Sequence, residues 1–169
     1  DIVYWLAQRQ TGTPQVVRAS ADPSPQVIST PPIDLALENA SSLAGAEMLV
    51  YSQAGHTFAC LTVPGLGTLG ETLCFDVKES LWHKRGGWDD GTASFTRWRA
   101  RGCCMVGQEV YVGDWETGDL YLLDLETYDD NGVILRRLRR APYLSDNNQV
   151  VFIDQFELGM QPGVGLSSG

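Results

Sequence analysis

The sequence predicts an all-β fold, a propeller-like arc of four-stranded antiparallel blades, and three observations support this prediction. Most of the chain falls into short β-branched and aromatic segments separated by turn signals. Only one segment looks helical. The pattern strand–turn–strand–turn–strand begins at residues 3, 58 and 110, giving steps of 55 and 52. Repeats of roughly 40–50 residues are typical of β-propellers. The alternative is an antiparallel β-sandwich.

The first repeat unit covers about residues 1–32 and precedes the helix-like segment. Its strands "VYWLAQ", "QVVRAS" and "QVIST" are separated by the turn signals "QTGT" and "ADPSP". Residues 33–44 carry Leu35, Leu37 and Leu43, but the Ser and Asn residues among them limit the helix to one or two turns.

The second and third units, at about 46–86 and 97–140, each add one strand before this pattern. The second unit is expected to hold strands at 46–53, 58–63, 72–77 and 80–85, and the third at 97–107, 110–115, 120–125 and 133–138. A further unit is expected to start at 149. Alternation predicts that the buried faces include Val3, Trp5, Phe58, Cys60, Leu73, Phe75, Val110, Val112, Leu120 and Leu122.

We expect residues 1–169 to form a single domain that is a piece of a longer chain. Asp1 leads directly into an apolar strand, and the end "QPGVGLSSG" shows no structural stop. No signal peptide is expected in this stretch, although a targeting segment could have been lost with the missing part of the longer chain. No apolar run approaches the roughly 20 residues of a membrane helix. The sequence therefore predicts no membrane partner, and its four cysteines, interpreted as reduced thiols, favour synthesis in the cytoplasm.

Residues 112–132, "VGDWETGDLYLLDLETYDDNG", concentrate seven carboxylates. An EF-hand loop with Gly132 at its sixth position would place Thr127 first and Leu138 last, and neither residue fits the calcium-binding template. The favoured interpretation is turn chemistry, with Asn131-Gly132 as a strong turn dipeptide. A looser calcium site around Asp129, Asp130 and Asn131 remains the alternative.

No motif for catalysis or for a cofactor is present. The chain lacks GxSxG, HExxH and a glycine-rich phosphate loop. The candidate carboxylates Asp76, Asp114 and Asp124 stand at strand ends, where turn chemistry explains them, and His56 and His83 are interpreted as ordinary surface or packing residues. The four cysteines have no zinc-site spacing and are predicted to be reduced thiols packed as small hydrophobic residues. We expect no enzyme activity, metal or cofactor.

The basic residues carry the sharpest pattern in a chain of formal charge -9. Seven of the 12 Lys and Arg residues fall in two segments, and these seven are candidate protein-contact residues: Arg97, Arg99, Arg101, Arg136, Arg137, Arg139 and Arg140. Alternation would place the first three on one face of a strand. Internal pairing with carboxylates is the favoured interpretation, and contact with an acidic partner surface is the functional alternative. Direct contact with DNA phosphates is less favoured, because the net charge is negative.

Several stretches resemble the packaged-DNA stabilisation proteins of short-tailed bacteriophages, also called tail accessory or hub proteins. The most specific is "GDWETGDLYLLD", followed by "DDNG" and "RRLRR". The resemblance covers nearly the whole chain, and its other stretches are "VYWLAQ", "VISTPPIDLAL", "YSQAGHTFACLTVP", "TLCFDVKESLWHKRG", "RWRARGCCMVGQEV" and "FELGMQPGVG".

The resemblance implies a structural role in the tail of a phage or prophage particle. Copies of the chain would form a ring below the portal, close the head after packaging, and bridge to further tail proteins. The family contributes no catalytic residues. The opposing hypothesis is a carbohydrate-binding or glycan-active propeller domain.

Overall fold

A computed structural model describes residues 2–20, 24–140, 150, 152–155, 157 and 159 of the chain. The chain divides into two compact units, residues 1–124 and residues 125–169, which are considered separately below. Within the described residues, the helical content is too short and too polar to cross a membrane.

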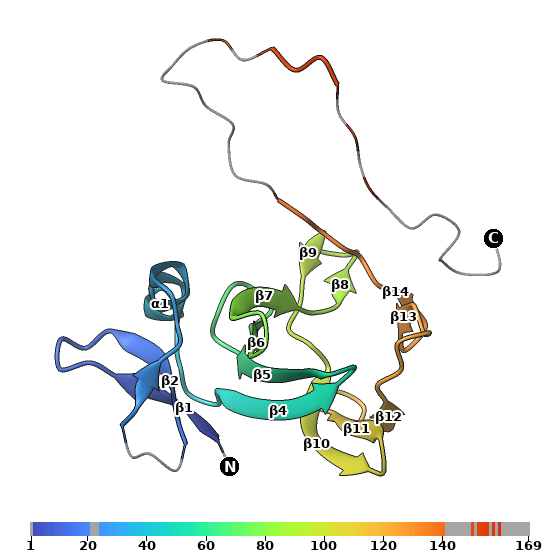
Figure 1. The fold of residues 1–169 in the computed structure, drawn as a ribbon. Helices are drawn as coiled ribbons and strands as arrows, with labels where there is room; N and C mark the ends of the chain where they lie inside the picture. Colours follow the sequence, from blue (N-terminus) through green and yellow to red (C-terminus); the bar gives the residue numbers. More distant parts are fainter. Residues whose placement is uncertain are drawn as a thin grey trace. The chain divides into compact units, whose positions relative to one another are not determined.

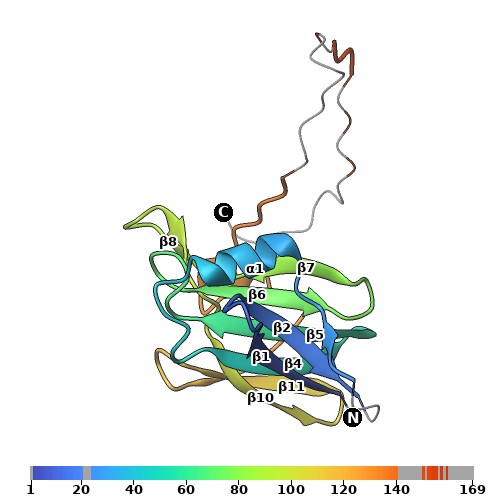
Figure 2. The same cartoon turned by 90° about the vertical axis from the view of Figure 1, so that its left-hand side faces the viewer.

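The first unit contains three antiparallel sheets of three or four strands that follow one another along the chain (Figures 1 and 2). In each sheet, strands adjacent in sequence are adjacent in space. The first sheet is β1 (Val3–Gln8), β2 (Pro14–Ala19) and β3 (Gln26–Val27); the second is β4 (Glu47–Gln53), β5 (His56–Val63), β6 (Glu71–Asp76) and β7 (Leu81–Arg85); the third is β10 (Ala100–Val106), β11 (Glu109–Asp114) and β12 (Leu120–Leu122). This arrangement confirms the all-β prediction.

Two smaller elements connect the sheets. Helix α1 (Pro31–Glu38) joins the first sheet to the second and packs on β2. It starts with two prolines after the extended residue Thr30, which suits a helix N-terminus because proline has no amide hydrogen to leave unpaired. The hairpin of β8 (Trp88–Asp89) and β9 (Ser94–Phe95) joins the second sheet to the third, and the sequence did not predict it.

The second sheet is buried on both faces, which explains its nearly continuous apolar strands. On β5, Ala59 and Leu61 belong to the core shared with the first sheet, whereas Cys60 between them belongs to the core shared with the third. On β6, Leu73 and Cys74 divide in the same way. Both faces are covered because successive side chains on a strand point in opposite directions. The sheet has the four strands predicted for one repeat unit.

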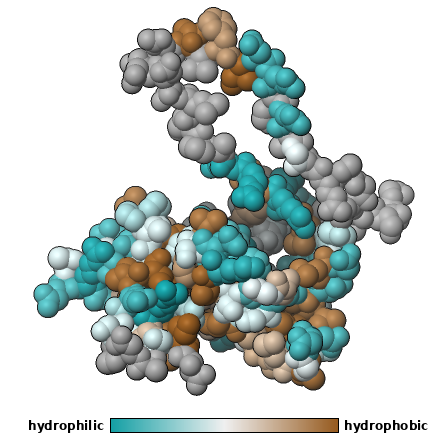
Figure 3. Space-filling view, viewed as in Figure 1, coloured by the Kyte–Doolittle hydropathy of each residue, from teal (hydrophilic) through white to brown (hydrophobic). Residues whose placement is uncertain are grey.

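Some predicted buried positions are exposed. Val3, Leu120 and Leu122 are solvent-exposed, whereas Cys60, Leu73, Phe75, Val110 and Val112 are buried as predicted, and Trp5 and Phe58 are half-buried. The prediction assigned the wrong face of β1 and β12, since Tyr4 and Tyr121 contact the core instead. Figure 3 shows apolar surface remaining over the third sheet, at the lower right of the view.

The predicted fourth strand of the third unit is wrong. Val133–Ile134, as β14, pairs instead with β13 (Asp129–Asp130) in a separate two-stranded sheet of the second unit. The predicted Asn131-Gly132 turn closes this hairpin, and both residues have positive φ, at 53° and 79°. Such φ values fit a two-residue hairpin turn, which holds β14 against β13. Residues 135–140 follow without strand structure.

The further unit expected from residue 149 is not seen in the described part of the chain. Residues 141–149 lie outside the described residues, as do residues 151, 156 and 158. The described residues between 150 and 159 are in no strand.

Candidate functional site

The candidate site is the seam between the second and third sheets, where β4 lies beside β10 and β11. Arg97 and Arg99 lie just before β10, and Arg101 lies in it, so three of the arginines singled out in the sequence lie at this seam.

Asp114 ends β11 and organises the turn that follows it. Its Oδ1 accepts hydrogen bonds from the amides of Glu116 (2.7 Å) and Thr117 (3.3 Å), and its Oδ2 accepts one from Arg99 Nε at 2.7 Å. Burial would raise the pKa of Asp114, but these amides and the Arg99 guanidinium outweigh it and hold the pKa below its usual range. Gly118 closes the turn with a φ of 77°.

The same turn recurs after two other strands. Asp76 Oδ1 accepts from the amides of Lys78 and Glu79, and Asp89 accepts from those of Gly91 and Thr92. In the second unit, Asp129 Oδ1 accepts from the amide of Gly132. An aspartate that bonds to backbone amides two and three residues on stabilises the turn. These carboxylates therefore serve turn geometry, and within the described residues no cluster of three potential metal ligands forms.

Acid should destabilise the first unit through Asp76 and Asp114. Although burial acts to raise the pKa of Asp76, hydrogen bonds from His56 and the turn amides lower it overall. Both carboxyls thus have folded-state pKa values below their unfolded values near 3.9. Their stabilisation is present above pH ~4 and is lost as the pH falls through the folded values. Urea denaturation at about pH 6 and at about pH 3 measures this loss of stability. The loss should be smaller in Asp76→Asn/Asp114→Asn, because this variant lacks both carboxylates and is already less stable at about pH 6.

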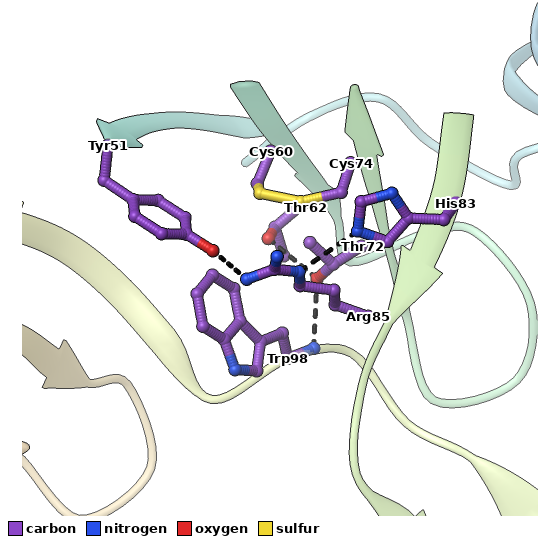
Figure 4. The surroundings of a disulfide bond; sticks show 8 residues. All are labelled: Tyr51, Cys60, Thr62, Thr72, Cys74, His83, Arg85 and Trp98. Carbon is purple, nitrogen blue, oxygen red and sulfur yellow. Dashed lines mark hydrogen bonds between the residues drawn. A yellow bond between two sulfur atoms is a disulfide. The ribbon is translucent and has the colours of Figure 1, made fainter. Parts of the chain in front are cut away.

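Arg85, at the end of β7, inserts its guanidinium among aromatic rings of the seam (Figure 4). Its Cζ lies 4.5 Å from the centroid of Phe58, 5.3 Å from that of Trp98 and 5.4 Å from that of Tyr51. One terminal nitrogen donates to the Tyr51 hydroxyl, and Nε donates to His83 Nε2. Burial lowers the pKa of Arg85 to about 10, which leaves it charged at neutral pH. This cation–π cluster joins β7 to β4 and to the segment entering the third sheet.

A disulfide between Cys60 and Cys74 lies beside this cluster, so the prediction of four reduced thiols is wrong for these two residues (Figure 4). The two cysteines are directly opposite each other on β5 and β6, with Cα atoms 4.1 Å apart. Cross-strand neighbours on the same face are close enough to bond. Cys103 and Cys104 are free and exposed.

The structure separates the three arginines at 97, 99 and 101. They do not share one strand face as predicted, because β10 begins only at Ala100. Arg99 pairs with Asp114 and with Glu116, and Arg101 pairs with Glu47 at 2.7 Å. These two follow the favoured interpretation of internal pairing. Arg97 differs: its guanidinium carbon lies 3.4 Å from the ring centroid of Trp115.

The other four candidate arginines lie in the second unit. Arg136, Arg137, Arg139 and Arg140 are all exposed and lie outside strands, although the sequence predicted a strand over residues 133–138. Nothing in the described structure tests whether they contact a partner.

Sequence reasoning missed the main residues of the seam. Arg85, Tyr51 and Trp98 received no role. His56, interpreted as an ordinary surface or packing residue, lies in β5 and pairs with Asp76 at 2.7 Å. One signal of the cluster was available in the sequence. His83 and Arg85 are two residues apart on β7 and therefore lie on the same face of that strand. The rings that meet Arg85 come from β4, from β5 and from residue 98, and no local pattern links these positions.

Comparison with known proteins was consistent with this architecture. Residues 1–128 match the model of a phage stabilisation family, described as bacteriophage P22 Gp10, β-propeller. The match covers the three sheets of the first unit and ends four residues beyond it. A search of curated proteins found no match.

Proposed function

The chain belongs to the family of bacteriophage P22 Gp10 β-propeller proteins, and from this premise we propose how it acts. Membership makes it a phage structural protein that stabilises packaged DNA and a component of the virion. We propose that copies assemble in a ring, plug the portal after packaging, and bridge the portal to tail proteins. The observation that supports this proposal is the match of residues 1–128 to the family model.

The charge and packing of the chain support a plug that blocks DNA exit rather than one that binds DNA tightly. A formal charge of -9 gives no general attraction to phosphates. The second sheet is buried against sheets on both sides, which suits a part that must resist pressure from packaged DNA. We therefore propose a structural, non-enzymatic role in the tail.

Deletion of the gene in the phage that carries it tests the plug. Particles lacking the protein should package DNA and then lose it, and expression of the wild-type protein from a plasmid should restore full heads. The measurement is the fraction of DNA-filled heads by electron microscopy, together with nuclease sensitivity of the released DNA. Mutant heads that retain DNA as well as complemented ones would refute the plug. Electron microscopy of the protein mixed with its portal tests the ring.

The exposed arginines of the second unit provide a test of the assembly interface. In Arg137→Ser/Arg139→Ser, ring formation or attachment to the portal should weaken at low salt, and the difference from the wild type should shrink as the salt concentration rises. Thermal stability should hardly change, because exposed charges contribute only about 0–1 kcal/mol. Arg18→Ser/Lys78→Ser is the matched control: it changes the net charge equally but lies in the first unit, and it should assemble normally. If the arginine variant assembled as well as the control variant, Arg137 and Arg139 would be solvent-exposed residues with no role in assembly.

A further inference from the structure

Arg97 is held in one orientation without a carboxylate partner among the residues that the structure describes. Its aliphatic stem packs against Gly70, where an added Cβ would lie 3.2 Å from Arg97 Cδ, and its guanidinium lies over Trp115. Arg99 and Arg101, in contrast, are both in ion pairs. Stacking uses the face of a guanidinium and leaves the N–H groups at its edge available to an acceptor.

The stacked pair lines a groove between the second and third sheets. One cavity, of about 570 Å³, is bounded by β4, β5 and β10 and includes Glu47, Thr62, Ala100 and Arg101. A second, of about 190 Å³, shares these four residues and adds Arg97 and Trp115. The shared residues show that the two cavities are neighbouring parts of one groove. The groove therefore presents the Arg97 guanidinium and the Trp115 ring beside the Glu47–Arg101 ion pair.

We propose that this groove binds an acidic peptide segment of a partner protein, with one Asp or Glu carboxylate accepting two hydrogen bonds from Arg97. A planar guanidinium fork fits a carboxylate in this bidentate manner. The neighbouring side chains favour a single carboxylate over a polyanion. Glu47 lines the same groove, and Glu116 follows directly after Trp115. Glu47 is paired with Arg101 and Glu116 with Arg99, so among the described residues Arg97 is the cation of this groove without a carboxylate partner. One acidic group of a peptide matches this single cation, whereas successive phosphates of DNA would need further unpaired cations.

The proposal does not depend on the virion role, because the isolated chain can be tested. The probe is an acetylated, amidated pentapeptide with one glutamate between apolar residues, and the control peptide has glutamine at that position. NMR follows the indole N–H signal of Trp115, assigned by its loss in Trp115→Phe. The glutamate peptide should shift this signal saturably, and the glutamine peptide should not.

Three variants connect the shift to Arg97. Arg97→Gln should lose at least about tenfold in affinity, and Arg97→Lys should lose less because it keeps the charge without the fork. Arg18→Gln, in the first sheet, should bind as the wild type does. Unchanged dispersion of the other indole signals shows that each variant is folded. If Arg97→Gln fails this criterion, it is replaced by Arg97→Met, which keeps an aliphatic stem against Gly70 and removes the guanidinium.

Several results would overturn the proposal. They are no saturable shift with the glutamate peptide, equal binding of the two peptides, and wild-type affinity in Arg97→Gln. Tighter binding of a short DNA duplex than of the peptide, with a steep salt dependence, would assign the groove to nucleic acid instead.

Discussion

Replacement of Asp114 by alanine is expected to lower the free energy of unfolding by about 3 kcal/mol, the low end for breaking a buried ion pair. The Asp114 side chain is fully buried, and its loss leaves two backbone amides and Arg99 Nε without their acceptor. An unsatisfied donor that remains away from water costs more than the net value of the bond it made. Arg99 keeps its contact with Glu116, which limits the loss. Urea denaturation monitored by tryptophan fluorescence measures the change.

Asp119→Ala is the matched control in the same turn. The Asp119 carboxylate is exposed and accepts one long hydrogen bond, from the Tyr121 hydroxyl at 3.4 Å. Its removal should change stability by no more than about 0.5 kcal/mol, as for most surface substitutions. Equal effects of the two replacements would mean that the turn tolerates loss of the Asp114 cap, and the carboxylate would then need another explanation.

The order of strands could be predicted from the sequence because it depends on local signals. In the second sheet, alternating and β-branched segments between turn residues located each strand to within two residues. The third sheet shows the limit of such signals. The segment at 133–138 has strand-like composition, but composition does not choose a pairing partner. The tight Asn131-Gly132 turn determined the partner, and it pairs β14 with β13.

The site was less predictable, because it depends on contacts between sheets. Asp114 was correctly assigned to turn chemistry, since its role lies within three residues of sequence. The Arg85 cluster joins residues 51, 58, 85 and 98, which meet only when the second sheet packs against the third. The different contacts of Arg97 and Arg99 also depend on the end of β11 and the turn after it. Asp114 there pairs with Arg99, and Trp115 stacks with Arg97. A strict alternation rule treats these two arginines as equivalent.

The disulfide shows why strand register matters. Strands at 58–63 and 72–77 were predicted, and such a hairpin pairs residues whose numbers have a constant sum. The observed pairs, such as Phe58 with Asp76, set that sum at 134 and place Cys60 opposite Cys74. A sum of 135, from the predicted strand limits, would have placed Cys74 opposite residue 61, out of reach of Cys60. A shift of one residue moves every side chain to a new partner, and strand limits are not known that accurately from sequence.

Loss of the Cys60–Cys74 disulfide is expected to lower stability by about 3 kcal/mol, because the bond closes a loop of 14 residues in the unfolded chain. The comparison is urea denaturation with and without reductant, and with Cys60→Ala/Cys74→Ala. The matched control is Cys103→Ser/Cys104→Ser, which alters only the exposed free thiols and should shift stability by about 0.5 kcal/mol or less.

Thiol counting tests the bond itself. Alkylation of the denatured protein without reductant should modify two cysteines, and alkylation after reduction should modify all four. Modification of all four without reductant would restore the prediction of reduced thiols made from the sequence. The seam would then depend on packing of Cys60 and Cys74 as small apolar side chains, since both remain buried against Val110 and Val112. Reductant would in that case leave the denaturation midpoint unchanged, so the two measurements must agree for the bond to be accepted.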